Sequence, residues 1–297
     1  MNLVQIHLLI INMRHRDIVK SCFEKAKYIH DNISDGGKII HQGAGFGDLH
    51  NDTEIKLDKE IGEKIRDLIW KATNGKASVS VEGLDTIEGK NPNLWFCVDP
   101  LDGSLNYRKR GLSLGAPYTI CMTVLDRFDD ATFSNVVLGA NMDFRNGDTW
   151  ISEKRKDGNF RTSFNGIVQK PSDAVKLNLG SDIFVGEMYY PSNRRLMSEI
   201  FEGQKGYLRS FGSAAWEIAS VASGQVLAHI CDQQKQHESG MGYAVVKGAG
   251  GVAVNFKGED LGDTPFTFND QNDVIFAGNE VIAEEIVRRI QRVLRIK

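Results

Sequence analysis

The sequence predicts an α+β protein, with helices at both ends of the chain and strands concentrated in its middle. Three observations support this prediction. Apolar residues recur at helical spacing over residues 3–32 and again from Leu57, strand-like apolar runs follow between residues 77 and 142, and both patterns alternate after Pro171. With 297 residues, of which 41% are hydrophobic and 25% charged, the chain is long enough for one large or two moderate domains.

The first half is expected to begin with a helix over residues 3–32, followed by a flexible glycine-rich stretch over residues 43–52. A second helix runs from about Leu57 to the sequence TNGK, because Leu57, Ile61 and Ile65 fall on one face. Strands are predicted next, over residues 77–83, 94–99, 116–125 and 134–142.

The second half mixes helices and strands. Ser213 and Gly224 delimit a helix of small residues, with Ser213 as its N-cap. Glycines close another helix, which leads into a strand, within residues 240–256. The other elements predicted here are strands over residues 175–180 and 182–188, and helices over residues 193–202 and 281–296.

Charge and composition argue against several classes of partner. The chain carries 36 basic and 39 acidic residues, so no positive field would attract nucleic acid or an anionic membrane. Its four cysteines are widely separated and form no CxxC pair, which disfavours a zinc site or a disulfide framework and indicates a cytoplasmic protein. The apolar N-terminal run LLIIN is too short to span a membrane.

The stretch FCVDPLDGSLNYRKRG places Asp99 and Asp102 three residues apart at the end of an apolar run. Two carboxylates at the end of a buried strand repel each other unless cations, hydrogen-bond donors or solvent compensate them. Pro100 restricts the backbone between them, and Gly103 allows a sharp turn. Ser104 is able to cap a short helix whose N–H groups would receive phosphate. The same DxxDG pattern also occurs as an ordinary turn, so spacing alone leaves that alternative open.

Three further acids add to this pair, namely Asp58, Glu82 and Glu238. Carboxylate oxygens suit Mg²⁺ or Mn²⁺, and several of them converge only when cations offset their charge. Taken singly, Asp58 is explained as a first-turn helix acid, and Glu82 and Glu238 as solvated surface carboxylates. Their combination with the aspartate pair favours a metal site.

Several motifs carry a resemblance to a known family. VDPLDGSLNYRKRG resembles the metal motif of the inositol monophosphatase family, and in particular its archaeal-type branch, which also hydrolyses fructose 1,6-bisphosphate. RSFGSAAWEIASVASGQVLAHI is similar to the family's second-half helix segment, and HESGMGYAVVKGAGG stands in place of its WDxAAG...EAGG motif. The resemblance covers most of residues 40–290. It implies a layered α/β/α/β/α sandwich, with residues 1–172 as an N-terminal α+β half and residues 173–297 as a C-terminal α/β half.

The resemblance also implies an activity and a set of site residues. The chain would be a magnesium-dependent phosphatase, with Mn²⁺ as an alternative cofactor, and would form a homodimer. Its substrate would be a small phosphorylated sugar or polyol, with fructose 1,6-bisphosphate and inositol monophosphate as the leading candidates. The metal ligands implied are Glu82, Asp99, Asp102, Glu238 and the backbone carbonyl of Leu101. Asp58 and Ser104 would polarise the attacking water beside Glu82, and the amides of Gly103 and Ser104 would hold the phosphate.

The sequence departs from the family pattern at several of these positions. Ile55 stands where a threonine is usual, Gly83 replaces a second glutamate, and His237 with Glu238 replaces the WD pair. Gly248 replaces the EAGG glutamate, and Cys231 falls where inositol-specific members carry a glutamate. Two alternatives therefore stay open: a phosphatase acting on 3'-phosphorylated adenosine, and a catalytically weak binding or regulatory relative.

Two basic residues near these motifs have competing interpretations. Arg209 resembles, by position, a basic residue of the bisphosphatase branch that meets a second phosphate, a role that suits a guanidinium group. An exposed loop charge is the alternative. His237 has no partner histidine nearby in the sequence, so it is predicted to be an incidental surface residue and not a metal ligand.

Overall fold

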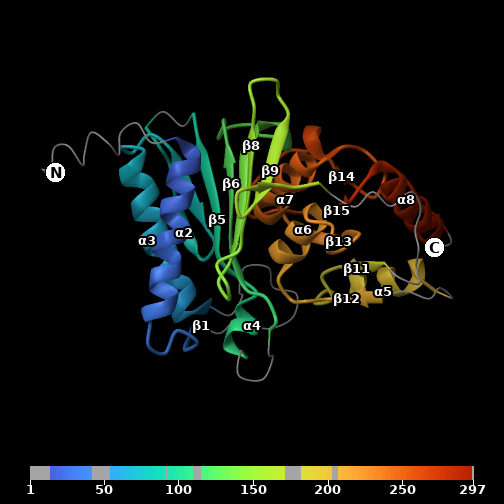
Figure 1. Cartoon of the computed structure of the whole chain (residues 1–297), viewed down its shortest axis with the longest axis horizontal. Coiled ribbons are helices and arrows are strands. Elements are labelled where there is room, and N and C mark those ends of the chain that lie inside the picture. The colour runs from blue at the N-terminus through green and yellow to red at the C-terminus, as the bar shows by residue number, and fades with distance from the viewer. Residues whose placement is uncertain are drawn as a thin grey trace, which may run out of the picture.

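The computed structural model describes residues 14–41, 54–90, 93–109, 115–170, 182–202 and 207–295. Helices and sheets alternate as layers across the molecule, as Figure 1 shows. This arrangement confirms the predicted α+β class and the α/β/α/β/α sandwich that the resemblance implies.

The larger sheet is built from strands in the first part of the chain. Its order is β10 (Ile167–Val168), β9 (Phe160–Phe164), β8 (Thr149–Lys154), β7 (Val136–Asp143), β6 (Thr119–Leu125), β5 (Trp95–Asp102), β3 (Ser78–Val81) and β4 (Leu84–Ile87). Strands β3 and β5 pair in parallel, and the other neighbours pair antiparallel. Parallel pairing brings the carboxyl ends of β3 and β5 to the same edge of the sheet.

The smaller sheet is built from strands in the last part of the chain. Its order is β12 (Tyr207–Arg209), β11 (Ile183–Val185), β13 (Ala228–Lys235), β15 (Gln271–Ala277) and β14 (Val252–Val254). Strand β11 runs parallel to β12 and β13, whereas β15 is antiparallel to β13 and β14. A short pair, β1 (Ile39–His41) with β2 (Glu54–Ile55), lies apart from both sheets.

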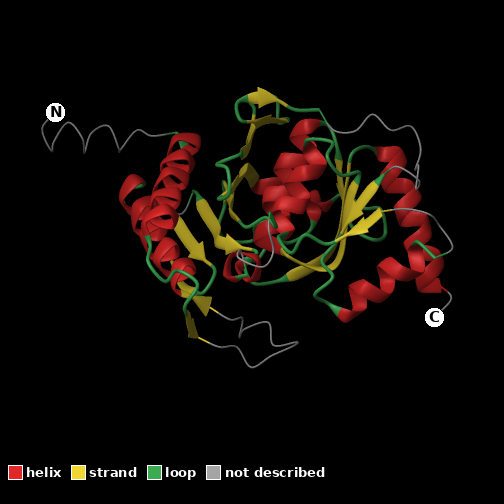
Figure 2. Cartoon of the chain, turned by 60° about the horizontal axis from the view of Figure 1, so that its bottom comes forward, coloured by secondary structure: helices red, strands yellow, loops and turns green. Residues whose placement is uncertain are grey.

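Helices cover both faces of both sheets (Figures 1 and 2). The outer face of the larger sheet packs against α2 (His15–Asn32) and α3 (Lys56–Ala72). The layer between the sheets is α6 (Ala214–Ala222) with α7 (Gln236–Ala249), and the outer face of the smaller sheet carries α5 (Pro191–Ile200) and α8 (Glu280–Arg295). Each of the three resulting interfaces is filled by its own cluster of buried apolar side chains.

Helix α7 is buried along most of its length because it lies between the two sheets. Hydroxyl groups of the larger sheet donate to its backbone carbonyls, from Ser152 Oγ to Ala244 O at 2.7 Å and from Thr162 Oγ1 to Val245 O at 2.6 Å. A Cβ at Gly248 would clash with both of these hydroxyl oxygens. Glycine at this position, where the resemblance implies a glutamate, therefore allows α7 to approach the sheet closely.

Most predicted elements are confirmed, with adjusted ends. The first helix is described from His15, the helix expected from residue 193 begins at Pro191, and the helix expected from residue 240 begins at Gln236. Apolar periodicity misses the first turn of α7, because Gln236 to Ser239 are polar although they are buried. The predicted flexible stretch 43–52 and strand 175–180 lie outside the described residues.

Some strands carry too weak a pattern to be predicted. The strands β4, β8, β9 and β10 fall in segments where charged and turn-forming residues interrupt the apolar alternation. Among the described residues, no helix combines the length and the apolar character that crossing a bilayer requires.

Candidate metal centre

A bulge at the end of β5 places Asp99 and Asp102 on the same side of the larger sheet. Asp99 pairs with Cys121 and Asp102 pairs with Thr119, so one extra residue is inserted into β5 between the two pairs. In a regular strand, the side chains of residues three apart point to opposite faces. The extra residue returns the side chain of Asp102 to the face of Asp99. Pro100 suits the bulge because it has no backbone N–H to donate to the sheet.

Asp102 is held by neutral donors at the N-terminus of α6. Its Oδ2 accepts from Ser213 Oγ at 2.5 Å and from the Ala215 amide at 2.9 Å. Ser213 is also the N-cap of α6, as predicted, since its side chain accepts from the Trp216 amide. Burial raises the pKa of Asp102, and these hydrogen bonds only partly oppose that effect.

Asp99 is the most crowded carboxyl group of the centre. It is 3% exposed, and its Oδ1 accepts from the Leu101 amide at 2.9 Å. Burial and then the charges of Glu82, Asp102 and Glu238 hold its pKa well above the usual range. The group needs an additional positive charge to stay ionised near neutral pH.

Glu82 follows β3 directly and has charged partners of its own. Its Oε1 forms an ion pair with Lys235 Nζ, and its Oε2 lies 3.6 Å from His237 Nε2. Burial opposes ionisation, but Lys235 and His237 together hold the pKa of Glu82 well below its usual range. Glu82 is therefore a carboxylate whose charge the protein already balances.

Glu238 lies in the first turn of α7, and a buried hydrogen-bond chain reaches it from α6. Its Oε2 accepts from Gln234 Nε2, and Gln234 Oε1 accepts from His229 Nε2 at 2.8 Å. The other ring nitrogen, Nδ1 of His229, lies 3.2 Å from Glu217 Oε2. Burial, followed by the charge of Asp102, holds the pKa of Glu238 well above its usual range.

A second bulge makes this chain of contacts geometrically possible. His229 and Gln234 are five residues apart on β13 and would face opposite sides of a regular strand. The β13–β15 register shifts between Cys231 and Gln234, which turns both side chains to the same face. At its far end, Glu217 Oε1 accepts from the Phe211 amide at 2.5 Å. The chain therefore links Glu238 to the loop that follows Arg209.

The structure places the predicted phosphate-binding residues beside this loop, with one correction. Gly103, not Ser104, is the N-cap of α4 (Ser104–Arg108), and Ser104 is the first residue of that helix. Gly103 has a φ of 82°, and a Cβ there would lie 2.9 Å from Pro117 O and 3.0 Å from Gly212 O. Only glycine combines that conformation with such close backbone approach, so the local turn explains why the cap carries no side chain.

Two other predicted residues lie on α3 and at the end of β12. Asp58 is half-buried in the first turn of α3, and its charge contributes to the raised pKa of Asp99. Arg209 ends β12 and is exposed, with its guanidinium carbon 5.3 Å from the centroid of the Tyr207 ring.

The side chains of the centre form two groups with the right chemistry for cations. Oxygen atoms of Asp99, Asp102 and Glu238 lie within 4.8 Å of one another, and so do ligand atoms of Glu82, Asp99 and His237. The buried imidazole nitrogen His237 Nε2 has no hydrogen-bond partner among the residues that the structure describes. Three buried carboxyl groups with raised pKa values, together with a buried nitrogen that makes no hydrogen bond to the described residues, fit a divalent cation.

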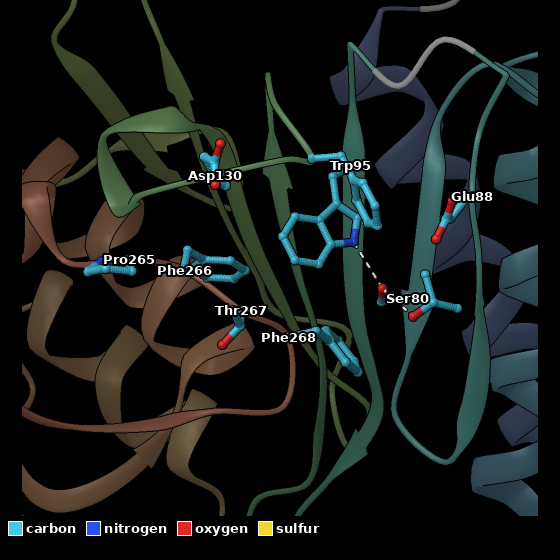
Figure 3. Close-up of a pocket in the computed structure, with 11 residues that line it drawn as sticks. Ser80, Glu88, Trp95, Asp130, Pro265, Phe266, Thr267 and Phe268 are labelled. Atoms are coloured by element: carbon cyan, nitrogen blue, oxygen red, sulfur yellow. Dashed lines mark hydrogen bonds between the residues drawn. The ribbon is translucent and has the colours of Figure 1, made fainter.

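One pocket described in the structure has none of the carboxyl groups of this centre in its lining. It has a volume of about 430 Å³ and lies between β3, β5 and the segment after η2 (Leu261–Asp263). Figure 3 shows Trp95, Phe266 and Phe268 around it, with Trp95 Nε1 donating to Ser80 Oγ at 2.9 Å. Among the described residues that line it, the charged ones are Glu88 and Asp130, and both are acidic. This pocket therefore does not suit a phosphate dianion.

Sequence reasoning missed several residues of the centre. His237 was predicted to be an incidental surface residue, and this is wrong, because it is 3% exposed and lies against Glu82. Lys235, Gln234 and His229 were not singled out from the sequence. Lys235 lies in the KQHESG stretch with His237, and Gln234 directly precedes that stretch. A polar run that follows a buried strand is the signal that would have identified them.

Comparisons with known proteins agree with this geometry. The model of the inositol monophosphatase family matches residues 19–295. The chain is 26% identical over 266 residues to the fructose-1,6-bisphosphatase/inositol-1-monophosphatase of Methanothermobacter thermautotrophicus, covering 86% of this chain and 88% of that protein. It is 24% identical over 254 residues to the inositol-1-monophosphatase of Bacillus subtilis, covering 80% and 82%. The solved structure of an IMPase from Thermotoga maritima superposes with a TM-score of 0.75 at 22% identity, covering 96% and 99%.

Proposed function

This chain belongs to the inositol monophosphatase family, and from that premise we propose that it is a Mg²⁺-dependent phosphatase acting on a small phosphorylated sugar or polyol. The leading substrates are fructose 1,6-bisphosphate and inositol monophosphate, the two that the names of its curated relatives suggest. The observation that carries the proposal is the convergence of Asp99, Asp102 and Glu238, three buried carboxyl groups held by neutral donors. Oxygen-only groups of this kind suit Mg²⁺, with Mn²⁺ as the alternative.

The cation-binding residues proposed are those that the family resemblance identifies. They are the side chains of Glu82, Asp99, Asp102 and Glu238 with the backbone carbonyl of Leu101. When bound, divalent cations would neutralise the phosphate and lower the pKa of a coordinated water. The bulge at Pro100 and the neutral donors fix the carboxylates before the substrate arrives, so little reorganisation is required.

The proposed roles of the remaining residues follow from their positions. Asp58 and Ser104, beside Glu82, would accept hydrogen bonds from the attacking water and orient it. The amides of Gly103 and Ser104 would donate to the phosphate, since the positive φ of Gly103 turns the backbone at the end of β5. Arg209 is exposed and lies three residues before Gly212, whose carbonyl approaches Gly103, and in this position it would meet a second phosphate.

The cellular setting proposed is also an inference from the family and the chemistry. A homodimer is the assembly that the resemblance implies. A cytoplasmic location is favoured by the cysteines, which are free buried thiols throughout.

A substrate panel tests the proposal directly. The full chain is incubated with Mg²⁺ and each of fructose 1,6-bisphosphate, inositol 1-phosphate and 3'-phosphoadenosine 5'-phosphate, and released phosphate is measured with and without EDTA. We expect release from at least one of the first two substrates and its loss in EDTA. Preferred release from the nucleotide would favour the nucleotide phosphatase. No release from any substrate, with retained metal binding, would favour a binding or regulatory relative.

A further inference from the structure

His237 is oriented by the backbone on one side of its ring. Its Nδ1 lies 3.1 Å from Phe268 O, and a carbonyl oxygen only accepts, so Nδ1 carries the hydrogen. In the protonated ring Nε2 faces Glu82 as part of a cation, and in the neutral ring it presents a lone pair to which a metal ion would bind in place of that proton. The ring also stacks on Phe268 with centroids 4.8 Å apart, and Thr123 Oγ1 donates to His237 O at 2.6 Å. These contacts leave the imidazole little freedom to turn away.

The imidazole of His237 lies close to two carboxyl groups, those of Glu82 and Asp99. His237 is 3% exposed, and its Nε2 lies 3.6 Å from Glu82 Oε2, a separation too long for a hydrogen bond. Asp99 completes the group, whose ligand atoms all lie within 4.8 Å of one another. Two ligand atoms that each lie about 2.1 Å from one cation are separated by roughly 3 to 4 Å. The spacing therefore suits a shared cation.

Glu82 contacts Lys235 and His237 through different oxygen atoms. Lys235 pairs with Glu82 Oε1, whereas the oxygen that faces His237 is Oε2. A metal-binding histidine usually donates its second N–H to a carbonyl or carboxylate, which fixes the tautomer and the ring. The Phe268 carbonyl is placed to supply that contact. An incidental buried histidine would instead use both ring nitrogens in hydrogen bonds.

We propose that His237 Nε2, Glu82 and Asp99 form a mixed nitrogen and oxygen site that selects a divalent transition metal, such as Co²⁺ or Zn²⁺, over Mg²⁺. The inference rests on the proposed metal-dependent function and adds a ligand and a metal class to it. Imidazole favours transition metals, whereas Mg²⁺ binds oxygen almost exclusively. The oxygen-only group of Asp99, Asp102 and Glu238 keeps its preference for Mg²⁺, so the two halves of the centre differ in the metal that they hold.

Metal titration of the full chain tests this assignment. After dialysis against chelator, the dissociation constants of Co²⁺ and Mg²⁺ are measured by calorimetry, and pulsed electron paramagnetic resonance of bound Mn²⁺ detects a coordinated ¹⁴N nucleus. We expect Co²⁺ to bind at least about tenfold more tightly than Mg²⁺. His237→Phe should weaken Co²⁺ binding about 10- to 100-fold, change Mg²⁺ binding much less, and remove the ¹⁴N coupling.

His30→Phe is the matched control, because His30 also stacks on a phenylalanine ring, that of Phe144, with centroids 5.0 Å apart. It lies on α2 in the outer helical layer, and its replacement should change neither metal affinity nor the spectrum. Wild-type protein without ¹⁴N coupling, or equal losses of both metals in His237→Phe, would overturn the inference. Asp99→Asn separates the two proposals: if wild type binds no cation, or Asp99→Asn binds as well as wild type, the metal-dependent function itself fails.

Discussion

The two ends of the carboxylate cluster balance their charge in different ways. At one end, Glu82 has Lys235 and His237 beside it, and its pKa is held well below the usual range. At the other end, Asp99 and Glu238 have pKa values held well above the usual range, because burial and neighbouring carboxylates oppose ionisation. Proteins seldom bury like charges without compensation. The carboxyl groups of the second end therefore require positive charge that the described residues do not supply.

Hydrogen bonding explains the difference. Neutral groups donate to Asp99, Asp102 and Glu238: the Leu101 and Ala215 amides, the Ser213 and Thr119 hydroxyls and the Gln234 side-chain amide. Such donors fix the direction of a carboxylate but do not cancel its charge. The charge of Lys235 lowers the pKa of Glu238, yet not enough to offset burial and Asp102. Orientation is thus supplied by the fold, and under the proposed function a bound cation would supply the neutralisation.

The largest expected effect comes from removing a carboxylate at the uncompensated end. Asp99→Asn and Asp102→Asn should each lower phosphate release at least about 100-fold, since cations contribute several kcal/mol to such reactions. In EDTA, the variants should be as stable as wild type or more so, because one repulsion is removed. At a Mg²⁺ concentration 100 times its dissociation constant, wild type should gain about 2.7 kcal/mol in unfolding free energy, and Asp99→Asn should not.

Steady-state assays and denaturation with and without Mg²⁺ measure these effects. Turnover close to that of wild type in both variants would show that the aspartates do not hold the catalytic metal.

These aspartates also show how far the sequence predicts the centre. The DPLDG stretch predicts two nearby carboxylates and a turn, and Pro100 restricts the backbone between the two aspartates. The bulge that puts both side chains on one face depends on pairing with β6, which no local pattern records. His237 was misjudged for the same reason: its partners, Glu82 and Phe268, are far from it in the sequence. Local chemistry was therefore predictable, and long-range compensation was not.

The next largest effect is expected from Arg209, if its guanidinium binds a substrate phosphate and does not contact the carboxylate cluster. Arg209 is exposed and pairs with no carboxylate among the described residues, so its guanidinium is available to a ligand. Arg209→Ala should weaken transition-state binding of fructose 1,6-bisphosphate by about 1.5 to 3 kcal/mol, the value of a charged hydrogen bond. Inositol 1-phosphate should lose much less, because it has a single phosphate. Comparison of kcat/KM for the two substrates decides this, and equal losses would assign Arg209 a structural role.

A smaller effect is expected from the neutral donor that orients Glu238. Gln234→Met keeps the volume of the side chain but removes the amide, so Glu238 loses the contact that directs it. Mg²⁺ affinity should fall about tenfold, the lower end of the range for partners of metal ligands. Calorimetric Mg²⁺ titration measures the change.

Gln233→Met is the matched control on the same strand, since Gln233 donates to Ser192 Oγ at 2.9 Å, away from the cluster. It should leave Mg²⁺ affinity unchanged. Equal affinities for Gln234→Met and wild type would mean that packing alone orients Glu238, and that the chain through His229 has no part in metal binding.

The smallest expected effect concerns Glu187, a carboxyl group outside the cluster. Burial raises its pKa, as it does those of Asp99 and Glu238. Burial, and then the charge of Glu217, raises the pKa of Glu187 from an ordinary 4.5 to about 7. The Tyr189 amide donates to Glu187 at 3.1 Å and opposes the shift, and His229 does so more weakly, while Asp102 adds to it. Unlike the cluster, Glu187 has no predicted metal to neutralise it.

The sign of its effect on stability follows from proton binding. Between about pH 4.5 and pH 7, folded Glu187 keeps a proton that the unfolded chain has released. Unfolding free energy therefore falls as pH rises through this window, and the contribution is fully present only below it. Glu187→Gln holds the site neutral at every pH, so its stability should fall less than that of wild type between pH 5 and pH 8. Urea denaturation in saturating Mg²⁺, which keeps the cluster charges fixed, measures the difference; identical slopes would show that Glu187 ionises freely in the folded protein.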